Sequence, residues 1–145
     1  MGSHMESKYC ERAKQLRAKG YNCAQAVACA FQEEVGLPEP LLFSLSEGFG
    51  GGMGGHAATC GSVSGAVLVL SLLTSKGSVG LATKSETYRR CNEVVSAFRE
   101  KNQSLVCSEL LGENGNSPLR SCDGCIEDAV MFVQNLLQKE GLLPR

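Results

Sequence analysis

Several features that define common functional classes are missing from this sequence. Acidic and basic residues nearly balance, at 15 and 14, and the formal net charge is -1. Because the two signs are interspersed, the sequence has no basic stripe for nucleic acid and no polybasic patch for a membrane surface. The longest apolar run, AVLVLSLL from Ala66, is far too short to cross a bilayer. We therefore expect no nucleic-acid partner and no insertion into a membrane.

Histidine is also scarce, which argues against hydrolytic chemistry. Residues 1–5, MGSHM, have the composition of an expression-tag remnant, so we set them apart from a single domain at residues 6–145. His56 is then the one native histidine, and the sequence suggests no serine or acidic partner for it. A serine–histidine–acid triad is not expected, and a lone loop histidine of this kind is typically solvated.

The apolar residues follow helical spacing almost everywhere, and no alternating strand pattern or internal repeat occurs. This predicts an all-α, single-domain bundle of about five to six helices. We predict helices at 6–19, 23–35, 40–45, 60–76, 85–102 and 123–140, with one or two turns at 107–112. The helix at 60–76 is apolar nearly all round after Gly65, so we expect it to be buried at the centre, preceded by a glycine-rich loop. On the helix at 85–102, Tyr88 should face the core and Glu86 should pair with Arg90.

Cysteine is abundant, with eight residues in the chain. Long helices supply an adequate core without disulfides, so these cysteines are more typical of metal ligands or redox thiols in a reducing, cytoplasmic compartment. Three lie on apolar helix faces and are expected to fill the core: Cys10, Cys29 and Cys91. Five lie at helix starts, near the predicted caps Asn22, Thr59 and Ser121: Cys23, Cys60, Cys107, Cys122 and Cys125. A helix start favours an anion, because its N–H groups are unpaired and the helix dipole is positive there, and it lowers the pKa of a thiol.

The CxxC motif at Cys122–Cys125 lacks the sequence context of several known types of cysteine site. A thioredoxin-like site would need a βαβ context, which the sequence lacks. Covalent haem attachment would need a histidine after the second cysteine, where Ile126 stands, and a zinc ribbon would need a second C-x2-C pair. An alternative is that one of the two cysteines is a ligand or redox thiol while the other fills the core.

Eight glycines lie between Glu47 and Val67. The segment GGGMGG fits GxGxxG, but no strand precedes it, and His56–Ala57 stand where a P-loop requires Lys and Ser or Thr. We expect instead that backbone amides in this region turn toward a thiolate or a metal–thiolate centre. The candidate glycines are Gly51, Gly52, Gly54, Gly55 and Gly61. The alternative is a flexible connector followed by a tight helix crossing at Gly61 and Gly65.

Five segments occur in a characteristic order: NCAQAV, FGGGMGG, TCGSVSGA, CSELLG and a closing cysteine before IEDAV. Together they resemble the C-GCAxxG-C-C family, whose members are described as redox-active. The resemblance implies a small helical protein with a CGAxxG motif, in which Ser62 here replaces the alanine. It also implies four hallmark cysteines, which fall on Cys23, Cys60, Cys107 and either Cys122 or Cys125. Members are often encoded near transporters, which implies an unidentified redox partner or a transporter-associated protein.

Three hypotheses follow from these observations. The first is a redox site formed by the helix-start cysteines. It would act by thiol–disulfide exchange, with Cys122 as nucleophile and Cys125 as resolving thiol, or hold an iron–sulfur or other metal centre. The metal ligands would be Cys23, Cys60, Cys107 and Cys122.

The second hypothesis is a structural zinc-binding or protein-interaction module without electron chemistry. The third is a helical ligand-binding domain whose glycine loop holds a small anion. Both an oxidoreductase and an electron carrier would fit the first hypothesis. Separately, the helix faces made of small residues are compatible with a homodimer.

Overall fold

The computed structural model describes residues 7–143, and the predicted tag remnant at 1–5 lies outside this range. In the described range the chain is all-helical, which confirms the predicted fold class. The helices are α1 (Lys8–Ala18), α2 (Cys23–Ala30), α3 (Gln32–Val35), α4 (Glu39–Glu47), α5 (Gly50–Met53), α6 (Gly61–Thr74), α7 (Lys84–Asn102), α8 (Cys107–Leu111) and α9 (Cys122–Lys139). These nine helices of residues 7–143 exceed the predicted five to six because α3, α5 and α8, of four or five residues each, are separate elements.

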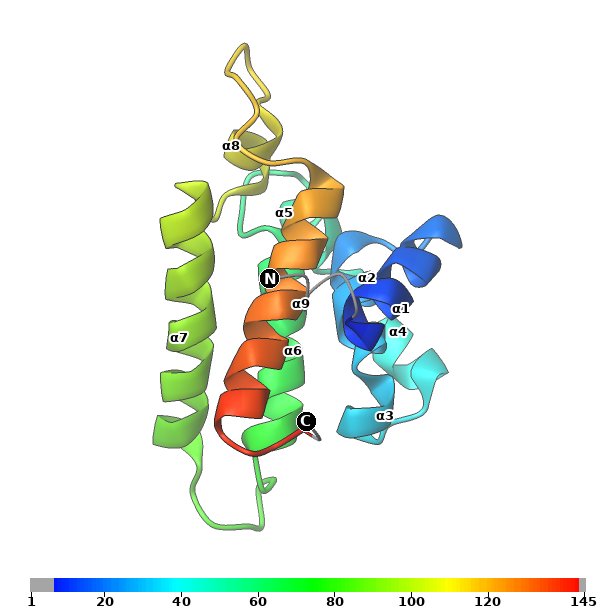
Figure 1. Cartoon of the computed structure of the whole chain (residues 1–145), viewed down its shortest axis with the longest axis vertical. Helices are drawn as coiled ribbons and strands as arrows, with labels where there is room; N and C mark the ends of the chain where they lie inside the picture. The colour runs from blue at the N-terminus through cyan, green and yellow to red at the C-terminus, as the bar shows by residue number, and fades with distance from the viewer. Residues whose placement is uncertain (1–6, 144–145) are drawn as a thin grey trace.

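The helices form two groups that meet along α6. Helices α6, α7 and α9 run side by side along the long axis of the molecule, while α1 to α4 cover the other side (Figure 1). Helix α2 joins the groups because it packs against α1, α4, α6 and α9. The starts of α6 and α9 lie with α5 and α8 at one end of the molecule, drawn at the top of Figure 1.

Helix α2 begins with a complete capping box, and Asn22 is its N-cap, as predicted. The Asn22 side chain accepts a hydrogen bond from the Gln25 amide at 2.9 Å, and the Gln25 side chain accepts one from the Asn22 amide at 2.9 Å. These contacts satisfy two amides that a helix start otherwise leaves unpaired. The predicted helix at 23–35 is divided at Phe31, whose backbone leaves the helical region before α3 begins.

Helices α2 and α6 approach each other closely because small residues face one another at the crossing. A Cβ atom built on Gly65 would lie 2.7 Å from the Ala24 carbonyl oxygen and 3.2 Å from the Ala24 Cα. All eight residues of α2 are buried, so the crossing lies inside the core. Helix α6 is buried along this side, and its other side carries partly buried side chains at Leu68, Leu72 and Leu73. No helix in residues 7–143 has the length and apolar character of a membrane span.

Three local expectations are wrong. Tyr88 is 65 % exposed, and Glu86 bonds to Arg89 rather than to Arg90, which reaches Glu140 instead. Helix α7 is therefore rotated so that Tyr88 points to solvent, and its charged side chains form a network with the end of α9. Thr59 does not cap α6, because Cys60 itself occupies the N-cap position.

We predict that Gly65→Ala lowers the free energy of unfolding by about 1–3 kcal/mol, which is typical of overpacking. Alanine is favoured over glycine inside a helix by roughly 0.5–1 kcal/mol, but the added methyl would collide with the backbone of α2, which cannot rotate away. The measurement is chemical denaturation followed by circular dichroism. Gly48→Ala is the matched control, since a Cβ there meets nothing within 4 Å. Equal stability of the two variants would contradict the tight crossing.

Candidate cysteine site

The five predicted helix-start cysteines line one cavity of about 320 Å³ at the end of the bundle where α6 and α9 begin. The cavity is lined by Arg17, Asn22, Cys23, Gly51, His56, Cys60, Cys107, Leu110, Leu111, Cys122 and Cys125. All eight cysteines of the chain lie in the described range and are free thiols. The structure therefore brings together the sulfurs that the sequence analysis grouped, and it leaves Cys10, Cys29 and Cys91 outside this cavity.

Each of these cysteines is positioned by the start of a helix. Cys23, Cys107 and Cys122 are the first residues of α2, α8 and α9, and Cys60 is the N-cap of α6. Ser121 caps α9 as predicted, because its hydroxyl accepts a hydrogen bond from the Gly124 amide at 2.9 Å. Cys125 follows Cys122 by three residues, so the two lie on the same face of α9. Several positive helix ends therefore point toward one group of sulfurs.

The sulfurs lie in two neighbouring pairs in the cavity: Cys122 lies beside Cys23, and Cys125 lies beside Cys60. The two cysteines of the CxxC motif thus have different partners, each on another helix. Cys122 is half-buried, whereas the exposed fraction is 6 % for Cys23, 6 % for Cys60, 7 % for Cys107 and 1 % for Cys125. Solvent therefore reaches this cluster mainly at Cys122.

Cys23 is the better stabilised anion of the outer pair. The hydrogen bond from Cys122 lowers the pKa of Cys23, and bonds from the Gly51 and Ala24 amides and the charge of Arg17 lower it further, against the effect of burial. The pKa of Cys122 is raised because its proton is held by Cys23 and because it is partly buried. Arg17 opposes this rise, since its Nη2 donates to the Cys122 Sγ at 3.5 Å.

The inner pair repeats this arrangement deeper in the molecule. The hydrogen bond from Cys125 lowers the pKa of Cys60, and the Ser62 amide at the start of α6 adds to that effect. The pKa of Cys125 is raised, first by its bond to Cys60 and then by burial. Burial and the neighbouring charges of Cys60 and Cys23 raise the pKa of Cys107 to about 11. The pKa values of Cys23 and Cys60 are therefore lower than that of an ordinary thiol, whereas those of Cys107, Cys122 and Cys125 are higher.

Three of the five predicted glycines contact these sulfurs or their side chains. Gly51 and Gly52 have left-handed backbone, with φ of 62° and 60°, which turns the chain so that the Gly51 amide reaches Cys23. A Cβ on Gly52 would lie 2.5 Å from the Cys107 Cβ, and one on Gly61 would lie 2.4 Å from the Cys23 Sγ. Gly54 and Gly55 have open space around them and do not line the cavity.

A short antiparallel contact, which the sequence analysis missed, fixes Cys60 beside Cys107. The Cys60 amide donates to the Leu105 carbonyl at 2.7 Å, and the Cys107 amide donates to the Ala58 carbonyl at 2.9 Å. An isolated bridge between Thr59 and Val106 lies at the centre of this contact. No sequence pattern marks it, because each side is too short for alternation to show.

A family model described as "Putative redox-active protein (C_GCAxxG_C_C)" matches residues 21–136. The chain belongs to the C-GCAxxG-C-C family. The matched range contains all five cysteines of the site, from Cys23 to Cys125, together with the glycine-rich segment. No curated protein and no solved structure matched the chain in the same comparisons.

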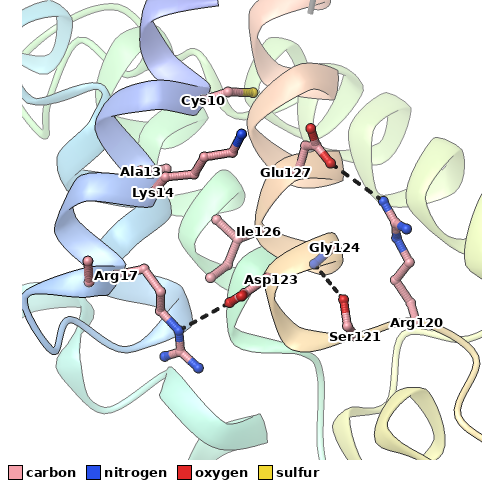
Figure 2. Close-up of a pocket in the computed structure, with 11 residues that line it drawn as sticks. Cys10, Ala13, Lys14, Arg17, Arg120, Ser121, Asp123, Gly124, Ile126 and Glu127 are labelled. Atoms are coloured by element: carbon pink, nitrogen blue, oxygen red, sulfur yellow. Dashed lines mark hydrogen bonds and ion pairs between the residues drawn. The ribbon is translucent and has the colours of Figure 1, made fainter. Parts of the chain in front are cut away.

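In this C-GCAxxG-C-C protein, Arg17 lies just before the matched range yet belongs to the site. It stands in the last turn of α1 and lines both the cysteine cavity and a second cavity of about 490 Å³ between α1 and α9. Figure 2 shows it reaching Asp123, with Nε 3.5 Å from the carboxylate. Nothing in the sequence singles out Arg17, because only the packing of α1 on α9 brings it to Cys122.

The potential metal ligands of the site are not gathered around one point in the described residues. In residues 7–143, no three or more His, Cys, Asp or Glu side chains are placed so that they could hold one ion. The predicted ligands Cys23, Cys60, Cys107 and Cys122 line a common cavity, but the sulfur contacts are pairwise. His56 also lines the cavity, and its Nδ1 lies 2.7 Å from the carboxylate of Glu113, an acidic partner that the sequence did not suggest.

We predict that Arg17→Gln raises the pH midpoint of thiolate formation at the Cys23–Cys122 pair by up to about one pH unit, because a nearby positive charge favours the thiolate form. Less thiolate at neutral pH should also slow alkylation of this pair. The midpoint is measured from the ultraviolet absorbance of the thiolate across a pH series. Lys14→Gln is the control, since Lys14 lies one turn earlier and pairs with Glu11 on the surface. An unchanged midpoint in Arg17→Gln would contradict the assigned role.

Proposed function

We propose that this family member catalyses or carries reversible thiol–disulfide exchange, with Cys122 as the reacting thiol and Cys23 as its resolving partner. The observation that carries the proposal is the outer pair itself. Cys122 is the half-exposed sulfur of the cluster, and it shares the cavity with the buried Cys23, whose pKa is lowered. The description of the family as redox-active supports the general class of chemistry.

The first step activates Cys122. Its proton passes to the neighbouring Cys23 thiolate, and the Cys122 thiolate then forms beside Arg17. This thiolate attacks one sulfur of a substrate disulfide. A mixed disulfide forms on Cys122, and the other half of the substrate leaves as a thiolate.

The second step resolves the mixed disulfide. Cys23 passes its proton to the departed thiolate and attacks the Cys122 Sγ, which releases the second half of the substrate as a thiolate. The protein ends with a Cys23–Cys122 disulfide, and the substrate disulfide has been reduced to one thiol and one thiolate. Two electrons and one proton have moved, which matches the single proton shared by the reduced pair.

The surroundings of the pair stabilise the charge that moves between the two sulfurs. When the charge lies on Cys23, the Gly51 and Ala24 amides hold it, and when it lies on Cys122, Arg17 and the start of α9 hold it. The resolving partner proposed here is Cys23 rather than the predicted Cys125, because the Cys125 thiol is paired with the Cys60 thiol instead. A cycle that starts from the reduced pair fits a reducing cytoplasmic compartment.

We predict that Cys122→Ser slows the reduction of a disulfide probe at least about 100-fold, because a serine hydroxyl is a far weaker nucleophile than a thiolate near neutral pH. The probe is oxidised glutathione, added to fully reduced protein under anaerobic conditions. The rate of glutathione release is measured, and the linked cysteines are identified by mass spectrometry after acid quenching. The wild-type product should contain Cys23–Cys122.

Cys91→Ser is the matched control, because Cys91 is the other half-buried cysteine and lies on α7, outside the cavity. It should react at the wild-type rate. Probe reduction by Cys122→Ser at the wild-type rate would refute the proposal, and so would an equal loss in Cys91→Ser.

A further inference from the structure

We infer that Cys60 and Cys125 form a second, internal dithiol–disulfide pair, which exchanges electrons with the outside only through Cys122. This inference rests on the proposed function of the outer pair and extends it. The sulfurs would then act in the order Cys23, Cys122, Cys125 and Cys60, and the protein would hold two electron pairs rather than one.

Burial separates the two pairs. Cys125 is 1 % exposed and Cys60 is 6 % exposed, whereas Cys122 is half-buried. Exchange requires the attacking sulfur to reach the disulfide sulfur directly, so its rate depends on access. A substrate disulfide can approach Cys122, whereas Cys60 and Cys125 belong to a buried cluster with Leu110. Because a substrate disulfide cannot reach Cys60 and Cys125, this pair needs a redox partner inside the protein.

The CxxC motif supplies that internal link. Cys122 and Cys125 lie three residues apart on α9, which places their Cβ atoms about 5–6 Å apart on one helix face. A disulfide needs about 3.5–4.5 Å, so a small adjustment in the first turn of α9 brings the two sulfurs within bonding reach. Gly124, between them, lines the α1–α9 cavity together with Asp123 (Figure 2), and the Arg120 guanidinium lies where a Cβ of residue 124 would stand.

The transfer is an internal exchange that needs no outside oxidant. It begins with a Cys23–Cys122 disulfide and one proton shared by Cys60 and Cys125. That proton moves to Cys60, and the Cys125 thiolate attacks the Cys122 Sγ, so that Cys122–Cys125 forms and Cys23 leaves as a thiolate.

Cys60 then gives its proton to Cys23 and attacks the Cys125 Sγ. The Cys60–Cys125 disulfide forms, and Cys122 is released as a thiolate beside Arg17. The outer pair again holds one proton, and the charge of the site is unchanged. The outer pair can then reduce a second substrate disulfide, so one fully reduced molecule would reduce two.

The test follows both disulfides over time after reduced protein receives one equivalent of oxidised glutathione. Samples are quenched with acid and alkylated, and the linked peptides are quantified by mass spectrometry. In the wild type we expect Cys23–Cys122 first, followed by Cys60–Cys125 at its expense. In Cys122→Ser, which keeps both inner sulfurs, Cys60–Cys125 should form at least about tenfold more slowly, because the intramolecular route is lost. Cys23→Ser should still form it, since Cys122 and Cys125 remain.

Cys91→Ser is the control and should follow the wild-type time course. Cys122→Ala repeats the test with a second side chain, and thermal unfolding compares the stability of both variants with that of the wild type. Formation of Cys60–Cys125 at the wild-type rate in both variants would overturn the inference. A wild type that forms Cys23–Cys122 but never Cys60–Cys125 would overturn it too, and would leave the proposed function standing. Absence of both disulfides would overturn the two proposals together.

Discussion

The close packing of α2 against α6 determines where the sulfurs lie. Gly61 and Gly65 remove the side chains that would separate the helices, and a Cβ at either position would collide with Cys23 or with the Ala24 backbone. This contact brings the starts of α2 and α6, with Cys23 and Cys60, to the same end of the bundle. Helix α9 packs on both helices, and its first turn completes the two sulfur pairs. The glycines that make the crossing possible are therefore also a condition for the grouping of the sulfurs.

The pKa of each cysteine thiol depends on what faces its sulfur rather than on burial alone. Burial raises the pKa of Cys29 to about 12 and also raises that of Cys10, as expected for thiols in an apolar core. Cys23 and Cys60 are similarly buried, yet the pKa of each is lowered, because a neighbouring thiol and backbone amides donate hydrogen bonds to the thiolate. The hydrogen bonds outweigh the desolvation of the charge. Cysteines of similar burial thus differ in the direction of the pKa shift, and the groups that face each sulfur decide that direction.

The sequence predicts local features of this protein well and long-range contacts poorly. The cap at Ser121 and the bounds of α9, predicted as 123–140 and observed as Cys122–Lys139, depend on neighbouring residues and are correct to within one position. The grouping of the helix-start cysteines also follows from the sequence, because each carries the same local signal. Their partners do not follow, since the packing of α9 on α2 and α6 decides that Cys122 meets Cys23. The same holds for Arg17, whose contact with Cys122 spans the chain from α1 to α9.

The central claim is that the site sulfurs act as two redox pairs. The most direct test counts free thiols in anaerobically purified protein across a series of dithiol–disulfide buffers, with metal and sulfide analysis of the same samples. The account predicts a fall from eight thiols toward four in steps of two, with Cys10, Cys29, Cys91 and Cys107 remaining free. It also predicts no stoichiometric metal. Eight free thiols throughout the series, or a metal centre that shields the site cysteines from alkylation, would contradict it.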